Sequence, residues 1–420
     1  MNRIAIWILL LLVLTSCSFS NSFKIEPENK KEAKNVDSSF IKQEELITEK
    51  SYKTNDEIGL GINTDIVGKS GQVNSKINLN GMLKLGVEKE NDALIYYNTD
   101  NNLIESINMN TGEIIETWNI INNRKNKVYA INMRNNIVAW AECPYGDVFP
   151  TQDKTHGAGW KLYYIDLLTK KIVKIDSDQG IILPEGHIEY GYLAPSKIAI
   201  SPEYISYITF DYNVEHRVTA VIKLYNIRTK KLEIIDYLDE DLSKNAFGYP
   251  NISNDKVVWC KALVNPDGTY KGQSFVYDIL TKEKTVLVTD ENVINPTISG
   301  DFICAEGKPG KTYYDGEVCI YNLKNNQWQY KINGEHTQYN QMKNTYLNTL
   351  TATDKYLLWE TAIQRTLMLF NFMDEKLYTI ISFDKGQEVY AELMSDNVLL
   401  YRTRPYNKNI KPIWRYLYLK

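Results

Sequence analysis

The chain has 420 residues, of which 43% are hydrophobic, and its formal net charge at pH 7 is −4. This length is sufficient for one large or two ordinary domains with a sizeable core. A charge so near neutral, without a dense basic segment, argues against a nucleic-acid partner. The 30 tyrosines and 8 tryptophans, and the absence of long segments with helical periodicity, predict an all-β protein.

The first residues, MNRIAIWILLLLVLTSC, have the pattern of an export signal. Arg3 provides a minimal positive start, and the apolar run from Ile4 to Leu14 is too short to span a bilayer as a helix. The run ends in LTSC, which resembles the bacterial lipoprotein signal. In that family a diacylglyceryl group is attached to the cysteine thiol, so the resemblance implies cleavage after Ser16 and lipidation of Cys17. An ordinary secretory signal with a chance cysteine is the alternative.

The next segment, residues 18–56, is rich in Ser, Asn, Lys and Glu, and its sparse apolar residues have no period. This composition is typical of a flexible tether. We therefore expect 1–16 to be a signal peptide and 17–56 to be a lipidated N-terminus and tether. The protein would then be exported and anchored to the outer face of a bacterial membrane, with membrane lipid as a partner through Cys17.

From about residue 80 onward, one phrase recurs at spacings of about 45–60 residues, which indicates a repeat architecture. The phrase is a short apolar run, an Asp or Asn, a polar turn and a second apolar run, as in FVYDILTKEK at 275–284. Asp and Asn suit such a turn because their side chains bond nearby backbone amides. This column holds Asn108, Asp166, Asn226, Asp278, Asn322 and Asn371.

A second column of aromatic residues precedes the first. It holds Tyr96, Trp140, Tyr207, Trp259, Trp359 and Tyr401, with Ala305 in the fifth unit. We expect these aromatic side chains to pack between neighbouring units rather than to bind a ligand.

Each unit reads as four strands, and the units start near residues 80, 128, 193, 248, 294, 347 and 388. Four-stranded units repeated around an axis form a β-propeller. The predicted fold of 57–420 is therefore a seven-bladed β-propeller of four-stranded antiparallel blades, with six or eight blades, or two irregular β-sandwiches, as alternatives.

The seventh unit stops at its third strand, RYLYLK, so its outer strand has to come from elsewhere. We expect the N-terminal side to supply it, with EIGLGINTDIV at 57–67 as the candidate. Over about residues 75–420 the repeats resemble TolB-like and WD-repeat-like propellers of the bacterial envelope. The WD dipeptide, the Gly-His signature and the paired Asp residues of TolB blades are absent. The resemblance implies binding of a partner without specifying which one.

Loop lengths provide the clearest functional signal. The turns after the Asp/Asn column are short, whereas 143–160, 178–195, 263–273, 307–316 and 333–348 are long and should project onto one face. We call this the long-loop face and its opposite the short-turn face. All four histidines, His156, His187, His216 and His336, map to the long-loop face. No pair of them has metal-ligand spacing, so we predict no metal, with several histidines converging on a metal near the axis, as in some propeller polysaccharide lyases, as the alternative. We also predict no cofactor.

The candidate ligand-binding residues are aromatic, histidine and charged side chains assigned to this face or to the upper channel. They are Tyr145, His156, Trp160, His187, Tyr190, Tyr249, Glu306, Tyr313, His336, Tyr339, Glu360 and Arg402. Tyr and Trp offer a large contact area with a polar tip, which suits a glycan or a peptide. Glu306 and Glu360 could instead serve as paired carboxylates in glycoside chemistry, or simply form channel salt bridges.

Three functions follow from these patterns. The first is a non-enzymatic module that binds a protein or cell-envelope ligand through the long-loop face. The second is a carbohydrate-active enzyme, a polysaccharide lyase or glycoside hydrolase, on the same face. The third is a surface scaffold without a small ligand. The chain has no G-x-S-x-G, P-loop or dinucleotide fingerprint, so we do not assign it catalytic residues.

Cys304 and Cys319 lie on the two arms of one predicted hairpin. If Glu306 faces Glu317, Cys304 faces Cys319, and a strained cross-strand disulfide could form. Two buried thiols that behave as small apolar residues are the alternative.

Overall fold

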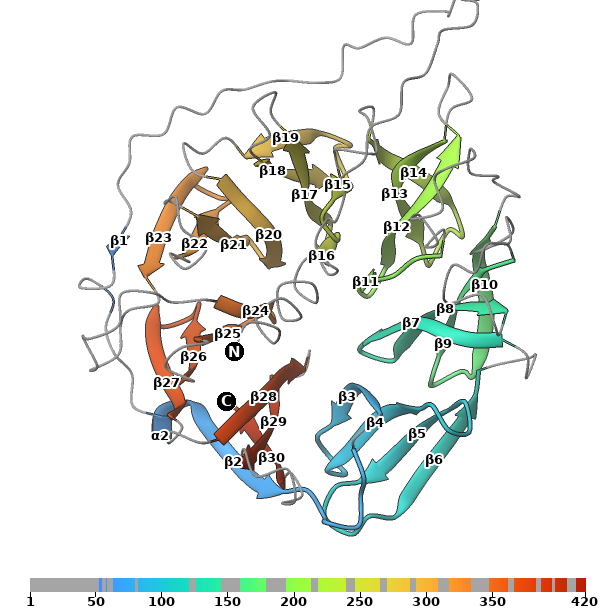
Figure 1. Cartoon of the computed structure of the whole chain (residues 1–420), viewed down its shortest axis with the longest axis vertical. Helices are drawn as coiled ribbons and strands as arrows, with labels where there is room; N and C mark the ends of the chain where they lie inside the picture. Colours follow the sequence, from blue (N-terminus) through green and yellow to red (C-terminus); the bar gives the residue numbers. More distant parts are fainter. Residues whose placement is uncertain are drawn as a thin grey trace, which may run out of the picture.

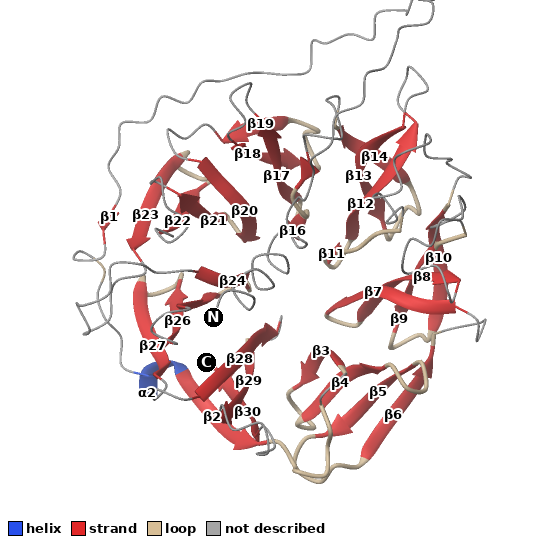
Figure 2. Ribbon diagram, in the orientation of Figure 1, coloured by secondary structure: helices blue, strands red, loops and turns tan. Residues whose placement is uncertain are grey.

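The computed structural model describes residues 53–54, 58, 63–79, 82–120, 126–144, 159–178, 194–212, 218–238, 246–264, 270–287, 292–308, 317–333, 347–361, 366–382, 387–394, 397–405 and 413–420. These residues form seven antiparallel sheets arranged in a ring (Figure 1). Nearly all of them are strand or turn, and α2 (Asn63–Ile66) is the helix among them (Figure 2). No described helix is long and apolar enough to cross a membrane. The protein is a seven-bladed β-propeller, as predicted.

Each blade is numbered in chain order, and its strands are given from the axis outward. Blade 1 is β3 (Leu83–Glu88), β4 (Ala93–Asn98), β5 (Leu103–Asn108) and β6 (Ile114–Asn119). Blade 2 is β7 (Asn126–Arg134), β8 (Ile137–Pro144), β9 (Lys161–Asp166) and β10 (Lys171–Ser177). Blade 3 is β11 (Ile198–Ile200), β12 (Tyr204–Tyr212), β13 (Val218–Asn226) and β14 (Leu232–Tyr237).

In blade 4 the innermost position is shared by β15 (Ala246–Phe247) and β16 (Asn251–Ser253), followed by β17 (Lys256–Val264), β18 (Tyr270–Asp278) and β19 (Lys284–Leu287). Blade 5 is β20 (Asn292–Ser299), β21 (Phe302–Lys308), β22 (Glu317–Asn322) and β23 (Gln327–Asn333). Blade 6 is β24 (Leu347–Ala352), β25 (Tyr356–Thr361), β26 (Thr366–Asn371) and β27 (Lys376–Ser382). Blade 7 is β28 (Gln387–Met394), β29 (Val398–Pro405), β30 (Ile413–Leu419) and β2 (Val67–Gln72).

The apolar core is divided among the seven junctions between blades. Each junction has its own cluster of buried side chains, contributed by the facing sheets of two neighbouring blades. The aromatic column lies on the second strands, and Trp140, Trp259 and Trp359 are at most 1% exposed. Their predicted packing role is therefore confirmed, because each one fills the junction with the preceding blade.

The repeated phrase forms the turn between the third and fourth strands. Asn108 Oδ1 accepts hydrogen bonds from the backbone N–H groups of Asn110 (2.9 Å) and Thr111 (3.0 Å). Asp278 Oδ1 does the same for Leu280 and Thr281, both at 3.0 Å. In every blade the backbone N–H of the residue that follows this position also donates a hydrogen bond to a carbonyl oxygen in the turn between the first and second strands. The N···O distances are 2.8–2.9 Å. The two turns of each blade at the short-turn face are thereby joined.

The N-terminal side closes the ring, as predicted, but through a different segment. The outer strand of blade 7 is β2, which pairs antiparallel with β30, whereas the predicted strand was 57–67. Two described apolar residues of that segment pack between blades: Ile58 joins the cluster between blades 5 and 6, and Ile66 joins the one between blades 6 and 7. The prediction was wrong because it took apolar content as the sign of a strand, although an outer strand is mostly exposed.

The N-terminal segment reaches blade 7 along the outside of two other blades. β1 (Lys53–Thr54) pairs in parallel with β23 of blade 5, and α2 lies beside β27 of blade 6 (Figure 1). The segment therefore contacts blades 5 and 6 before it completes blade 7. The sequence patterns did not predict this contact.

The four cysteines in the described part of the chain are buried free thiols. Cys304 lies opposite Ile320, and Cys319 lies opposite Ala305. The observed register of this hairpin therefore differs by one residue from the predicted register. A shift of one residue moves a side chain to the other face of a sheet, which separates the two thiols. The disulfide alternative is therefore wrong, and the buried-thiol alternative holds.

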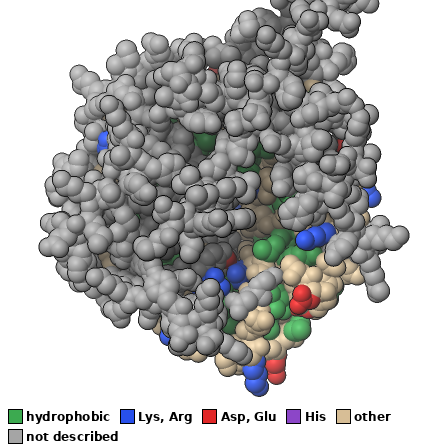
Figure 3. All heavy atoms as spheres, viewed as in Figure 1, with side chains coloured by type: hydrophobic (Ala, Val, Ile, Leu, Met, Phe, Trp, Pro, Cys, Tyr) green, Lys and Arg blue, Asp and Glu red, His purple; other side chains and the backbone are tan. Residues whose placement is uncertain are grey.

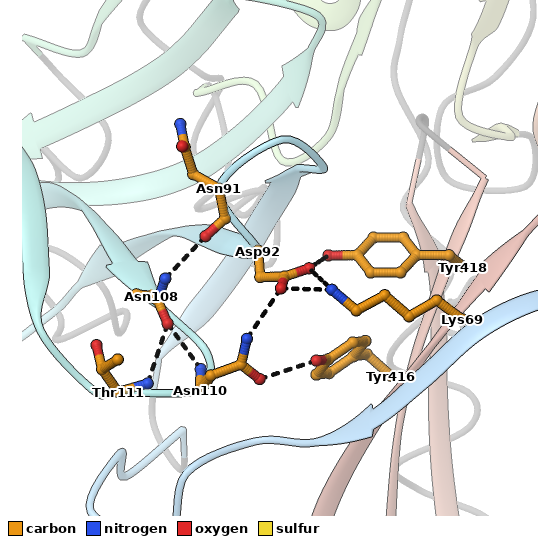
Figure 4. A network of polar contacts seen from close by, with 8 residues as sticks. All are labelled: Lys69, Asn91, Asp92, Asn108, Asn110, Thr111, Tyr416 and Tyr418. Atoms are coloured by element: carbon orange, nitrogen blue, oxygen red, sulfur yellow. Dashed lines mark hydrogen bonds and ion pairs between the residues drawn. The ribbon is translucent and has the colours of Figure 1, made fainter.

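A polar network, which we call the clasp, joins both chain ends to blade 1 (Figure 4). Asp92 accepts hydrogen bonds from Lys69 Nζ of β2 (2.7 Å), from the hydroxyl of Tyr418 of β30 (2.8 Å) and from Asn110 Nδ2 (2.9 Å). The hydroxyl of Tyr416 donates to Asn110 Oδ1 at 2.9 Å. One carboxylate thus connects the N-terminal strand, the C-terminal strand and the first blade.

We expect Asp92→Asn to weaken this closure while it preserves the backbone, since Asp92 has a φ of 49° and Asn tolerates positive φ. Burial opposes ionisation of Asp92, but the hydrogen bonds from Lys69, Tyr418 and Asn110 outweigh it and lower its pKa below 3.8. The stabilisation is therefore present above pH 3.8 and is lost as the pH falls through the lowered pKa. Chemical denaturation should show a loss of about 1 kcal/mol at neutral pH that disappears in acid. An equal loss at both pH values would contradict a role for the charge.

Candidate ligand site at the mouth of the ring

The described strand ends place the long segments on one face. The connections β8–β9, β17–β18 and β21–β22 join second to third strands, and β10–β11 and β23–β24 join blade to blade. In an antiparallel blade both kinds of connection leave at the end opposite the two short turns. Most of the five long segments, and with them Tyr145, His156, His187, Tyr190, Tyr313, His336 and Tyr339, lie outside the described residues. So do Cys17 and His216.

Trp160 does not belong to a surface site. Its side chain is 2% exposed and packs in the cluster between blades 2 and 3, with Leu162 and Tyr207. Its position beside β9 explains this burial, because it directly precedes a strand whose alternate residues face the junction. The assignment to a ligand site was therefore wrong. A loop-end tryptophan is indistinguishable from a core residue until the strand register is known.

Glu306, Glu360 and Arg402 occupy equivalent positions in consecutive blades. Each follows the aromatic column by one residue on a second strand, opposite Ile294, Asn348 and Tyr390 of the innermost strands. They therefore lie at one level, between the aromatic column and the long-loop face. Of the three, only Arg402 has a described side-chain contact.

The innermost strands form a closed ring around the axis. β3, β7, β11, β16, β20, β24 and β28 each contact the next, and β28 contacts β3. At the long-loop side of this ring, Lys197 of blade 3 lies over the ring of Tyr249 of blade 4, with Nζ 5.3 Å from the ring centroid. Tyr249 is 39% exposed, and Lys197 is also exposed.

The protein surroundings of Lys197 disfavour its charged form. Burial lowers the pKa of its ammonium, although solvent still reaches the side chain. A group can be both partly desolvated and reached by solvent when protein atoms surround it on most sides and leave one side open. Lys197 forms no ion pair with a described carboxylate, and its described partner is the face of an aromatic ring. Such an ammonium is available to an anionic or hydrogen-bond-accepting ligand.

A second basic group lies across the ring, at the junction of blades 7 and 1. The Nζ atom of Lys84, on β3, lies 4.5 Å from the ring centroid of Trp414. The central carbon of the Arg402 guanidinium lies 5.6 Å from the same centroid. Glu392 of β28 approaches Lys84 at 3.5 Å. Burial lowers the pKa of Lys84; Glu392 opposes this shift and Arg402 adds to it. Basic side chains are visible near the centre of the face, over the junction of β28 and β3 (Figure 3).

Arg134 crosses the opposite, short-turn end of the channel. It ends β7 of blade 2, and its guanidinium reaches the carbonyl of Ile252 in blade 4 (3.2 Å) and the carboxylate of Asp354 in blade 6 (2.7 Å). Further bonds join neighbouring blades at this level, from Gly300 N to Ser253 Oγ and from Thr353 Oγ1 to Asn397 Oδ1. The described residues therefore cross the channel at its short-turn end.

Two buried carboxylates resemble catalytic groups but act as structural contacts. Asp176 of β10 accepts hydrogen bonds from the hydroxyl of Tyr207 (2.7 Å) and from Lys223 (3.1 Å) in the next blade. One blade further on, Asp236 of β14 occupies the same position and accepts from Trp259 Nε1 (2.9 Å) and Lys284 (2.7 Å). Each carboxylate is saturated by its neighbours and joins two blades at the aromatic column.

The described residues contain no group of three His, Cys, Asp or Glu side chains that could hold a metal ion. The described part of the site is a basic and aromatic surface. Sequence reasoning missed Lys84, Lys197, Glu392 and Trp414. A lone lysine before a buried strand, as in SKIAI at 196–200, carries no periodic signal.

We expect Lys197 to titrate below 10.5, because burial disfavours its charged form. The measurement is an NMR titration of the protein after isotope-labelled reductive methylation, with the resonance assigned by Lys197→Arg. Titration at or above 10.5 would show that burial does not disfavour the charged form of Lys197.

No family model and no curated protein matches the sequence. The structure is similar to oligogalacturonate lyase in complex with manganese, with 8% identity, a TM-score of 0.52, and coverage of 84% of this chain and 96% of that one. It is also similar to the β-propeller domain of the Trilobed protease from Pyrococcus furiosus (11% identity, TM-score 0.45, coverage 77% and 88%). YCF48 bound to D1 peptide is a third (10% identity, TM-score 0.44, coverage 86% and 97%). The sheet topology gives the chain the fold of a seven-bladed β-propeller.

Proposed function

We propose that this protein is an exported, lipid-anchored binding module that holds a protein or cell-envelope ligand on its long-loop face. The observation that carries the proposal is the pair of Lys197 and Tyr249 at the mouth of the ring. A partly desolvated ammonium over an exposed aromatic ring combines charge, hydrogen-bond donors and a flat apolar face in one place. Recognition surfaces on rigid scaffolds are commonly built from such groups.

The closed ring supports the proposal in two ways. Seven junctions hold the innermost strands in place, so the mouth presents its side chains with little freedom to lose on binding. Arg134 crosses the other end of the channel, so the ligand approaches from one direction. The anchor at Cys17 is proposed from the sequence, because LTSC follows a short apolar run.

The test is site-specific photo-cross-linking on intact cells, with p-benzoylphenylalanine in place of Tyr249. We expect a reproducible adduct with an envelope component that is strongly reduced by Lys197→Met. Lys355→Met is the matched control, because Lys355 is an exposed lysine on the short-turn face. An adduct that survives Lys197→Met unchanged would argue against this site. Adducts obtained only from the short-turn face would argue against the choice of face.

A carbohydrate-active enzyme remains the second candidate, because Glu306 and Glu360 lie at equivalent positions on neighbouring blades, near the level of Lys197. If this function holds, purified protein should cleave an envelope polysaccharide and thereby produce new polysaccharide chain ends. Glu360→Gln should abolish this cleavage without changing the melting temperature of the protein. Glu283→Gln is the control, because Glu283 is an exposed carboxylate on the short-turn face. Binding of a glycan without cleavage would instead support the first candidate.

A further inference from the structure

One position is presented to solvent at the short-turn face of every blade. In blades 1 to 6 it lies two residues after the Asp/Asn column, at the tip of the turn between the third and fourth strands. The same backbone bond to the neighbouring turn fixes it in each blade, and in blade 7 the bond from Leu419 to Asn397 makes Lys420 the equivalent residue. From blade 1 to blade 7 the tips are Asn110, Leu168, Arg228, Leu280, Lys324, Met373 and Lys420.

The tips alternate between apolar and basic residues around most of the ring. Leu168, Leu280 and Met373, in blades 2, 4 and 6, are 74%, 72% and 77% exposed. Arg228, Lys324 and Lys420, in blades 3, 5 and 7, are exposed as well. Exposure of a large apolar side chain to this extent, at one repeated position in three blades, has no role in packing the blade.

The neighbouring residue already supplies the packing at each turn. Leu167, Ile279 and Phe372 directly precede the three apolar tips and are 6%, 8% and 8% exposed. The turn therefore needs one buried apolar residue, and the second one points into solvent. In blades 3 and 5 the same tip position is basic, which shows that the turn forms without an apolar tip.

The three apolar tips define a plane. They occur at the same point of the same turn on alternate blades, so the ring spaces them around the short-turn face at one level. Three separated points at one level do not form a groove for a peptide or a small molecule. They are suited to a broad, flat partner that accepts apolar side chains and tolerates basic ones between them.

The direction of β1 connects this face with the N-terminal segment. β1 pairs in parallel with β23, which runs from the short turn of blade 5 towards the long-loop face. The chain therefore enters β1 from the short-turn side. A tether that leads back from residue 53 towards Cys17 starts on that side of the ring.

We propose that the short-turn face lies against the lipid bilayer to which the protein is anchored, with Leu168, Leu280 and Met373 inserted at the headgroup level. This inference rests on the proposed lipid anchor at Cys17. Each tip contributes weakly, but a tether makes the contact intramolecular and raises its effective concentration. The inner turns carry carboxylates, such as Glu203 and Asp354, so the contact should depend on apolar insertion more than on lipid charge. The long-loop face then points away from the membrane.

The test uses the full-length lipoprotein in vesicles of phosphatidylglycerol and phosphatidylethanolamine that contain a headgroup-region nitroxide lipid. An environment-sensitive NBD label is placed at Leu280→Cys and, as the control on the other face, at Tyr249→Cys. The native described cysteines are buried, so an exposed thiol is labelled selectively. We expect several-fold stronger quenching at position 280 than at position 249, with Leu168→Cys and Met373→Cys behaving like position 280.

A second variant separates insertion from mere proximity. The combined change L168S, L280S and M373S should leave the melting temperature unchanged, because the three side chains are exposed. It should also reduce the quenching of a label at Lys324→Cys to the level of position 249. Equal quenching at both faces in protein that floats with the vesicles would overturn this surface and leave the anchor standing. Protein that does not float, and carries no diacylglyceryl group on Cys17, would overturn both.

Discussion

The pairing of β2 with β30 is the contact on which the rest of the structure depends. The core is not a single centre but seven clusters at the junctions between blades, and each blade contributes to two of them. A blade that lacks one neighbour leaves an apolar face exposed, so the ring is stable only when the last junction is closed. That junction uses residues from both ends of the described chain. Asp92 reinforces it because its carboxylate holds Lys69 and Tyr418 together.

The same arrangement separates stability from binding. The aromatic column and the buried carboxylates Asp176 and Asp236 lie between blades, where Asp176 binds the hydroxyl of Tyr207 and Asp236 binds the indole N–H of Trp259. Blades 1 and 5 have Trp118 and Ile332 at the corresponding outer-strand position, and the indole N–H groups of Trp140 and Trp359 then have no hydrogen-bond partner among the described residues. These buried positions set how firmly the blades pack. The two faces remain free to carry different chemistry: a basic and aromatic mouth on one side and exposed turn tips on the other.

The candidate site was predicted only in outline. Long segments on one face follow from the alternation of strand direction, which the repeat makes visible in the sequence. Trp160 was misplaced because its exposure depends on strand register. Lys84 and Lys197 were missed because their environments are created by other blades: Trp414 lies far from Lys84 in the sequence, and Tyr249 belongs to the blade after Lys197. Local patterns do not record contacts of this kind.

The sequence by itself determined the repeat, the number of blades, the turn after each Asp or Asn and the packing role of the aromatic column. These features are local, because side-chain hydrogen bonds within a turn and the two-residue period of a strand act over a few positions. Tertiary structure alone decided which segment closes the ring, the register that separates Cys304 from Cys319, and the partners of the buried charges. Those outcomes depend on which surfaces meet across a junction. Residues such as Asp92 and Tyr418 meet only because the ring brings the two ends of a long chain together.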